Sequence, residues 1–404
     1  MDEKGEQTEA SGGERKRLPP TVWALGTVSL CMDLSSETIH SLLPVFLVSV
    51  LGASTEMVGL IEGVAEATAM VTRVFSGALS DWLGRRKALA VAGYGLAALT
   101  KPFFALATGV GTVFGARFVD RIGKGIRGAP RDALVADVTP PELRGAAFGL
   151  RQSLDTVGAF LGPLAAVALM ALFHGRFRAV FWVACLPALA AVAVLIFGVR
   201  EPAAGRRRRT LPFSRRELST LGGRFWWVAA AGTAFTLARF SEAFLLLRAE
   251  NVGVRAGHVP LVLVAMNIAY TAVAYPAGRL SDRFGRGGPL ALGLAVLVGA
   301  DLVLAVAAGP WGVAAGAVLW GVHMGLTQGL FAALVADAAG ARLRATAFGV
   351  FSLLSGLALF AASLLAGWLW QTVSPAATFY AGAAIASATL FALLAFNSRP
   401  TARG

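Results

Sequence analysis

Apolar segments of roughly 20 residues follow one another along most of this 404-residue chain, with only short polar connections between them. A helix of that length crosses the hydrocarbon core of a bilayer, so each segment is a candidate membrane span. Charged residues make up 15% of the chain, whereas a soluble domain of ordinary composition carries about 25%. A soluble oligomer with a very large core is the alternative, and the run of apolar segments favours an integral membrane protein.

The apolar segments fall into two groups of six. Hydropathy and turn residues predict helical spans near 21–50, 55–80, 87–108, 111–136, 146–172, 178–199, 224–249, 258–281, 288–308, 311–336, 345–370 and 375–396. The predicted domains are a tail (1–20), a first six-helix bundle (21–199), a linker (200–223), a second six-helix bundle (224–396) and a final tail (397–404). Within the linker, we expect 213–221 to form a short amphipathic helix on the membrane surface.

The net charge of +13 follows the connections between spans and does not indicate nucleic-acid binding. Lysines and arginines gather in alternate connections, for example at 85–87 and 206–209, whereas most other connections are short and carry few charges. Connections rich in basic residues stay on the cytoplasmic side of a membrane. We therefore expect a multi-pass protein of the plasma (inner) membrane, surrounded by lipids, with both termini in the cytoplasm.

Other sequence patterns argue against cofactors and metals. Cys31 and Cys185 lie inside apolar segments, so neither a disulfide framework nor a thiolate metal site is expected. Residues 1–19 are polar and lack the apolar core of a cleavable signal peptide. The stretch 123–128 (GKGIRG) matches the glycine pattern of dinucleotide sites, but it lies inside a span and not between a strand and a helix.

The two groups of spans repeat each other in sequence. Residues 77–85 read GALSDWLGR and 278–286 read GRLSDRFGR, while 133–137 and 333–337 both read ALVAD. The shared offset of about 200 residues indicates that the halves arose by duplication. Parallel halves of this kind are a known transporter architecture, with substrate bound at their interface.

The loop pattern Gly77-x-x-x-Asp81-x-x-Gly84-Arg85-Arg86-Lys87 resembles the signature of the major facilitator superfamily, and its weaker copy follows the eighth span. Residues 117–123 (RFVDRIG) are similar to the motif of that family's fourth span, and 158–163 (GAFLGP) to its antiporter motif. The resemblance implies an all-α integral membrane protein with twelve transmembrane helices in two pseudo-symmetric six-helix bundles. It also implies a monomeric secondary transporter that works by alternating access.

The same resemblance implies a gate at the cytoplasmic ends of the helices. Its expected residues are Gly77, Asp81, Gly84, Arg85, Arg86, Gly278, Asp282, Gly285 and Arg286. In the family, spans one, four, seven and ten line the central cavity. All four spans carry polar residues near their midpoints in this chain.

Placing an ionisable side chain at the centre of a bilayer raises the free energy of membrane insertion by about 2.5–3.5 kcal/mol. Such residues are therefore expected to have a functional or structural role. We expect three carboxylates to exchange protons: Asp33, Glu37 and Asp120. We expect eight further residues to bind substrate: His40, Arg117, Arg121, Lys124, Arg127, Arg239, Glu242 and His323. The excess of cations in the fourth span favours an anionic or zwitterionic substrate. The alternative is that these charges pair with one another, for example Asp120 with Arg121 or Lys124.

A second set of charges lies in spans two and three, which usually sit beside the cavity. Glu62, Glu66, Arg73 and Lys101 are therefore interpreted mainly as interhelical pairs, and Arg151 with Asp155 in the same way.

The preferred function is transport of a small solute by a secondary transporter, coupled to protons and directed outward as an antiporter. An importer of an organic anion or metal chelate by proton symport is the alternative within transport. A third hypothesis is a membrane sensor that has this fold but does not transport a solute. A membrane enzyme is not expected, because no nucleophile–base set or metal-ligand set stands out.

Overall fold

The computed structural model describes residues 18–83, 85–200, 220–284, 287–338 and 343–397, and these residues form α-helices with no strand. The helices of the N-terminal half are α1 (Pro20–His40), α2 (Leu43–Val45), η1 (Phe46–Val50), α3 (Thr55–Leu83), α4 (Arg86–Leu106), α5 (Val110–Val138), η2 (Pro141–Leu143), α6 (Arg144–Leu172) and α7 (Phe177–Gly198). Those of the C-terminal half are α9 (Gly223–Leu237), α10 (Ala243–Asn251), η3 (Ala256–His258), α11 (Leu261–Phe284), α12 (Gly287–Val306), α13 (Pro310–Ala338), α14 (Arg344–Thr372) and α15 (Pro375–Asn397).

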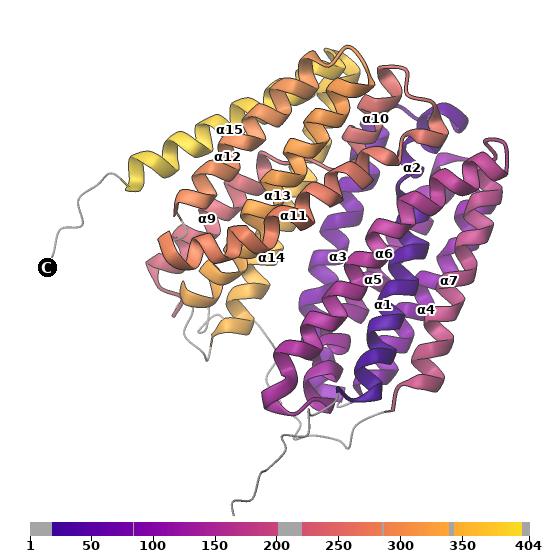
Figure 1. The fold of residues 1–404 in the computed structure, drawn as a ribbon, viewed down its shortest axis with the longest axis vertical. Coiled ribbons are helices and arrows are strands. Elements are labelled where there is room, and N and C mark those ends of the chain that lie inside the picture. The colour runs from indigo at the N-terminus through magenta and orange to yellow at the C-terminus, as the bar shows by residue number, and fades with distance from the viewer. Residues whose placement is uncertain (1–17, 84, 201–219, 285–286, 339–342, 398–404) are drawn as a thin grey trace, which may run out of the picture.

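The two halves lie side by side as helical bundles (Figure 1). Within the described residues, seven helices are long and apolar enough to cross a membrane; the highly charged α5 is not among them. This architecture confirms the predicted all-α membrane fold. Most of the expected amphipathic helix at 213–221 lies outside the described residues, as do most of both tails.

The duplication is visible in the packing of equivalent glycines. A Cβ atom on Gly125 of α5 would lie 2.5 Å from Thr72 and 2.8 Å from the carbonyl oxygen of Ala69, both on α3. A Cβ atom on Gly325 of α13 would lie 3.0 Å from the carbonyl oxygen of Tyr270 on α11. Small residues let helix backbones approach this closely in lipid. The glycines of 123–128 therefore serve helix packing, as expected for a glycine pattern inside a span.

Glycines also hold α6 against α1. A Cβ atom on Gly158 would lie 2.5 Å from the carbonyl oxygen of Leu30, and one on Gly162 would lie 2.5 Å from the Cβ atom of Glu37. The Thr38 hydroxyl donates a hydrogen bond to the Gly162 carbonyl at 3.2 Å. The segment that resembles the antiporter motif thus fixes the height and rotation of Glu37 in the bundle.

The structure has helices over both of the spans predicted near 21–50 and 224–249, but each is divided by a break. The first span stops at His40, since Pro44 has no N–H to donate to the carbonyl of His40 and so cannot continue the helix. The seventh span is interrupted at 238–242 between α9 and α10. Here the N–H of Ser241 donates to the side chain of Ser363 at 3.2 Å, and the N–H of Ala243 donates to the Ser241 hydroxyl at 3.3 Å. Local bonds of this kind compete with helical ones.

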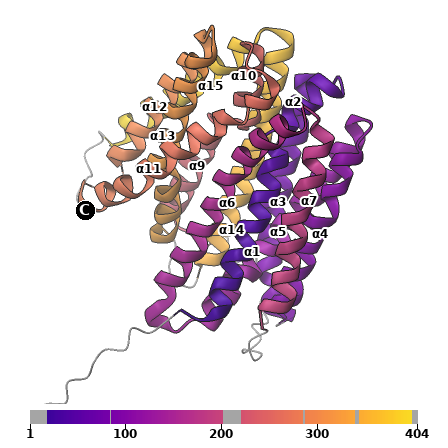
Figure 2. The ribbon, with the colours of Figure 1, turned by 45° about the vertical axis from the view of Figure 1, so that its right-hand side comes forward.

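The halves approach each other most closely at one end of the bundle. We call the end where α1 begins and α7 ends the linker end, and the end that carries α2 and η1 the far end. At the far end α2 packs against α10, Ser49 donates a hydrogen bond to Glu250, and the Thr55 hydroxyl donates to Gln371 at 3.0 Å. Toward the linker end the helices of the two halves diverge in both views (Figures 1 and 2).

The far-end contact continues along α3 and α14. A Cβ atom on Gly63 of α3 would lie 2.9 Å from Phe360 of α14, and one on Gly356 of α14 would lie 3.2 Å from Met70 of α3. These contacts extend the interface between the two halves from the far end to the middle of α3.

Candidate functional site

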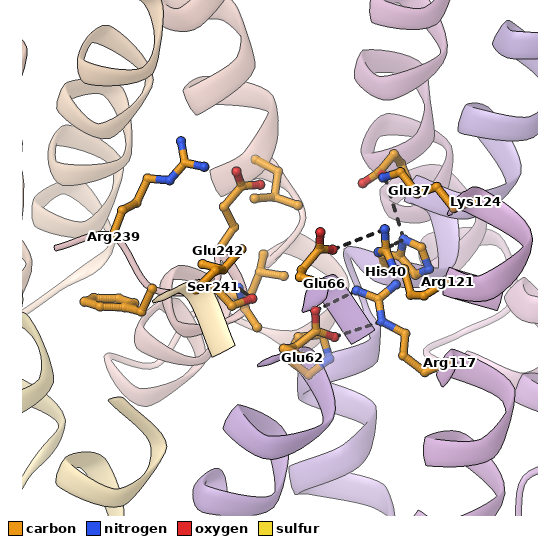
Figure 3. A pocket seen from close by; sticks show the side chains of 16 residues that line it. Glu37, His40, Glu62, Glu66, Arg117, Arg121, Lys124, Arg239, Ser241 and Glu242 are labelled. Carbon is orange, nitrogen blue, oxygen red and sulfur yellow. Dashed lines mark hydrogen bonds and ion pairs between the residues drawn. The ribbon is translucent and has the colours of Figure 1, made fainter. Parts of the chain in front are cut away.

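A cavity of about 230 Å³ lies between the halves, at the level where α1 ends and where α9 and α10 are interrupted. We call it the central cavity. Its ionisable lining residues are Glu37, His40, Glu62, Glu66, Arg117, Arg121, Lys124, Arg239 and Glu242. Residues from α1, α3 and α5 face Arg239, Ser241 and Glu242 of the interrupted span (Figure 3).

Two ion pairs join α5 to α3 in the cavity wall. Arg117 donates from Nε and Nη2 to the two carboxylate oxygens of Glu62, at 3.1 and 2.6 Å. One turn further along, Nη1 of Arg121 lies 3.2 Å from Oε1 of Glu66. A planar guanidinium matches a carboxylate in this two-bond arrangement, so the first pair is strongly oriented. The predicted interhelical role of Glu62 is confirmed, and Glu66 belongs to both a pair and the cavity lining.

The remaining charges of the central cavity are largely free. Among the described residues, Lys124, Arg239 and Glu242 have no ion-pair partner within 4.0 Å. Glu37 has one long contact, 3.7 Å from its carboxylate to Nδ1 of His40. Once the two ion pairs are set aside, the cavity therefore presents two cations and two carboxylates. Lys124 and Glu37 belong to the N-terminal half, while Arg239 and Glu242 belong to the other (Figure 3).

Behind the cavity wall lies a buried polar cluster. Nζ of Lys101 on α4 is 2.9 Å from Oδ1 of Asp120 on α5 and 3.0 Å from the Ser36 hydroxyl on α1. His40 lies between this cluster and the cavity, with Nε2 at 3.7 Å from Oδ2 of Asp120. Asp120 thus follows the alternative in which the charges pair with one another, but its ion-pair partner is Lys101 and not Arg121 or Lys124. Lys101 is fully buried and reaches Asp120 because α4 and α5 pack tightly through Gly93 and Gly123.

A second cavity, of about 340 Å³, lies nearer the linker end and shares Glu66 and Lys124 with the first. We call it the linker-side cavity. Asp33 and Arg127 face each other here at 3.7 Å, one turn nearer the linker end than Glu37 and Lys124. Its other charged lining residues are Arg73, Arg131, Asp132, Arg151 and Asp155.

Ion pairs link most of these linker-side charges. Asp132 lies within 4.0 Å of Arg73, Arg131 and Arg151, and Arg151 lies 3.8 Å from Asp155. The predicted pairing of Arg151 with Asp155 is therefore present.

The predicted site residues thus separate into four places. Seven line the central cavity: Glu37, His40, Arg117, Arg121, Lys124, Arg239 and Glu242. Asp33 and Arg127 line the linker-side cavity, and Asp120 lies buried behind the wall. His323 is fully buried between α13 and α12, where Nδ1 is 2.8 Å from the Gly293 carbonyl and the ring stacks on Phe235. In this conformation His323 does not reach the cavity.

The expected gate is described only in part. Gly84, Gly285 and Arg286 lie outside the described residues, as do the side chains of Asp81 and Asp282. Gly77 approaches α5, since a Cβ atom on this glycine would lie 3.4 Å from the methyl group of Ala129. Arg85 precedes α4, and Arg86 pairs with Asp137 at 2.5 Å and donates to the carbonyl of Ala133 at 3.0 Å. Gly278 lies within α11, where an added Cβ atom would meet none of the described residues within 4 Å.

Comparison with known proteins decides the family. The sequence model of the Major Facilitator Superfamily matches residues 25–247 and 229–404, one match for each half. The chain belongs to the Major Facilitator Superfamily. It is therefore a multi-pass membrane protein and a secondary transporter of a small solute.

Individual members of the superfamily resemble this chain over most of its length. An uncharacterized MFS-type transporter of Methanocaldococcus jannaschii, MJ1317, is 31% identical over 92% of this chain and 93% of its own. The inner membrane transport protein YajR of Escherichia coli is 26% identical over 94% of this chain and 82% of its own. The crystal structure of the nucleoside transporter NupG has a TM-score of 0.74 at 14% identity, covering 94% and 99% of the two chains. At that identity the likeness concerns the fold alone.

Proposed function

We propose that this transporter exports a small zwitterionic solute in exchange for protons. The observation that carries the proposal is the set of free charges in the central cavity. Lys124 and Arg239 offer two unpaired cations, and Glu37 and Glu242 offer two carboxylates without an arginine or lysine partner among the described residues. A ligand with one acidic and one basic group satisfies both kinds of charge.

A purely anionic solute fits this cavity less well. It would bind near Lys124 and Arg239 but would also lie beside Glu37 and Glu242, where like charges repel it. A purely cationic solute has the converse difficulty. Of the two expected substrate classes, anionic and zwitterionic, the zwitterion therefore fits the cavity better.

Competition for the carboxylates supports exchange with protons. A solute ammonium group and a proton both neutralise Glu37 or Glu242, so binding of one favours release of the other. His40 lies 3.7 Å from both Glu37 and Asp120, which provides a route between the cavity and the buried cluster. Asp33, in the linker-side cavity, is placed to pass protons toward the linker end. In this proposal Asp33, Glu37 and Asp120 carry the protons.

The proposed orientation puts the linker end in the cytoplasm, because the basic connections lie there. The comparison with YajR supports the inner membrane as the location. The described conformation is then joined at the outer side and open toward the cytoplasm. Rocking of the two halves would expose the same cavity to the other side. Arg86 and its partners at the linker end would form part of the gate, and the transporter would act as a monomer.

Everted membrane vesicles test this function, because export from the cell becomes uptake into the vesicle. The vesicles are given free amino acids and short peptides, each matched to its N-acetyl derivative (an anion) and its methyl ester (a cation). We expect the zwitterion to accumulate when a proton gradient is imposed, and to release protons from the vesicle. Vesicles with Lys124→Ala serve as the control. Accumulation only of the anion, or accumulation only in right-side-out vesicles, would contradict the zwitterion or the export direction.

A further inference from the structure

Asp301 on α12 is a fully buried carboxylate that neither the cavity nor the ion-pair network uses. Its exposed fraction is 0%, and both of its carboxylate oxygens lack a hydrogen-bond partner among the described residues. An ionised carboxylate buried without a cation or a donor is strongly unfavourable. The geometry is therefore that of a carboxyl group that holds its own proton.

Comparison with the other half sharpens this point. Asp301 occupies the repeat position of Lys101, since each lies eight residues before the glycine that precedes the next long helix, Gly309 or Gly109. Lys101 is also fully buried, but it has Asp120 on the neighbouring helix as its partner. In the C-terminal half the counterpart of Asp120 is Trp320, whose indole N–H is buried without a partner among the described residues as well. The charged side chain at this repeat position thus has a salt bridge in the N-terminal half, whereas in the C-terminal half it has no partner among the described residues.

The surroundings of Asp301 are apolar and tightly packed. A Cβ atom on Gly382 of α15 would lie 2.6 Å from Oδ2 of Asp301 and 3.1 Å from the ring of Phe240, so a glycine is required there. The Phe240 ring packs against Trp320 and Phe379, with ring centroids 5.3 and 5.5 Å apart. The carboxyl group lies within this aromatic layer.

No charged side chain of the packed helices neutralises Asp301 among the described residues. His323 of α13 faces the Gly293 carbonyl and Phe235. Arg248 of α10 donates to carbonyls at the end of α12, those of Leu304, Ala305 and Ala307. Arg239 faces the central cavity.

Phe240 connects this layer to the transport site. It belongs to the interruption between α9 and α10, and it also lines the central cavity beside Arg239 and Glu242. The same ring therefore borders the cavity on one side and the surroundings of Asp301 on the other. Movement of the interrupted segment would carry the ring away and admit cavity water.

We propose that Asp301 is a second proton-carrying group, located in the C-terminal half and gated by Phe240. In the described conformation its carboxyl O–H bond is intact. When Phe240 moves, that bond breaks, the proton passes to cavity water, and the carboxylate left behind is solvated; the reverse step restores the acid. The inference rests on the proposed proton coupling and adds a site outside the predicted set of proton carriers.

Infrared difference spectroscopy of the purified full-length protein tests the protonation without any substrate. A protonated carboxyl group has a C=O stretch that is separate from carboxylate bands and that shifts in D₂O. At neutral pH we expect the wild-type spectrum to contain such a band that is missing from Asp301→Asn and present in the control Glu142→Gln at an exposed position. A wild-type spectrum that Asp301→Asn leaves unchanged would overturn the proposal.

The rate of hydrogen–deuterium exchange of that band tests the gate. Phe240→Ala should speed the exchange by about tenfold, as local opening becomes easier. Phe379→Ala is the matched control, since it removes a ring from the same aromatic layer without touching the cavity lining. Equal effects of the two substitutions would contradict gating by Phe240.

Transport separates this inference from the function on which it rests. In proteoliposomes, Asp301→Asn should retain exchange of solute for solute but move fewer protons per solute than the wild type. A wild-type proton ratio in Asp301→Asn would show that the carboxyl group is permanently protonated and would overturn the proposal. If the wild type moves no protons at all, the proposed function fails, whereas the infrared result still reports on Asp301.

Discussion

Arg117 and Glu62 are joined by two hydrogen bonds across the α3–α5 interface, and their side chains are only 4% and 7% exposed. The pair fixes the wall of the central cavity at its far-end side. Together with the Arg121–Glu66 pair, it leaves Lys124 as the α5 cation of that cavity that has no ion-pair partner among the described residues. The paired charges of α5 should therefore contribute mainly to stability, and Lys124 mainly to substrate binding.

Glu62→Gln should destabilise the protein by about 3–5 kcal/mol, because it leaves the buried guanidinium of Arg117 without its counter-charge. Thermal unfolding in detergent, followed by circular dichroism, measures the change. The control is Glu56→Gln, at an exposed position near the start of the same helix. Equal stability of Glu62→Gln and Glu56→Gln would mean that the pair contributes nothing to the cavity wall.

Unlike Glu62→Gln, Lys124→Ala should leave the stability of the protein unchanged and weaken its affinity for substrate. Lys124 has no ion pair to break among the described residues, so its removal leaves no buried charge without a partner. A hydrogen bond to a charged group contributes about 1.5–3 kcal/mol, so KM should rise roughly 10- to 150-fold. Vesicle uptake across a range of solute concentrations measures it, with Lys124→Arg expected to recover part of the affinity. A destabilised Lys124→Ala with normal KM would assign the lysine to structure.

Glu37→Gln should separate solute binding from proton coupling. The amide keeps the shape of the side chain but cannot exchange a proton, so solute-for-solute exchange should continue while proton-driven accumulation is lost. Both are measured in the same vesicles, with Glu142→Gln, at an exposed position in η2, as the control. Retention of proton-driven accumulation in Glu37→Gln would move the proton-carrying role to another carboxylate.

Gly162→Ala should push α6 away from α1. Its new methyl group would meet the Cβ atom of Glu37 at 2.5 Å and the backbone nitrogen of Thr38 at 3.0 Å, so we expect a loss of about 1–3 kcal/mol. Transport should fall as well, since Glu37 is displaced. The matched control is Gly149→Ala on the same helix, where a Cβ atom meets none of the described residues within 4 Å. There the substitution should be neutral or stabilising, by up to about 1 kcal/mol. Similar unfolding temperatures for the two variants would contradict this packing.

The fold could be predicted from the sequence because its main determinants are local. Twenty-residue apolar segments, basic connections and repeated loop motifs all lie within short stretches of chain. The breaks at 41–42 and 238–242 were not predicted, because apolar residues surround them and the bonds that stabilise the second break come partly from Ser363, far away in the sequence.

The sequence predicts which types of residue form the candidate site better than it predicts which of these residues form ion pairs with one another. Glu37 and Lys124 could be chosen because charged residues in the middle of a span need a reason. The pairing of Asp120 with Lys101 depends on how closely α4 approaches α5, which glycine contacts decide and hydropathy does not reveal. Asp301 is also a charged residue inside a predicted span (288–308), so the same rule points to it, but the resemblance places spans one, four, seven and ten, and not this ninth span, around the cavity.

A reversible cross-link at the far end tests whether transport requires alternating access of the central cavity. Ser49 and Glu250 meet there across the two halves, so both are replaced by cysteine in a variant whose Cys31 and Cys185 are alanine. A short bis-methanethiosulfonate reagent should join them, stop transport in vesicles, and release it again after reduction, while Ser49→Cys alone is unaffected. Transport at the wild-type rate with the cross-link in place would show that the far end need not open, and would contradict alternating access.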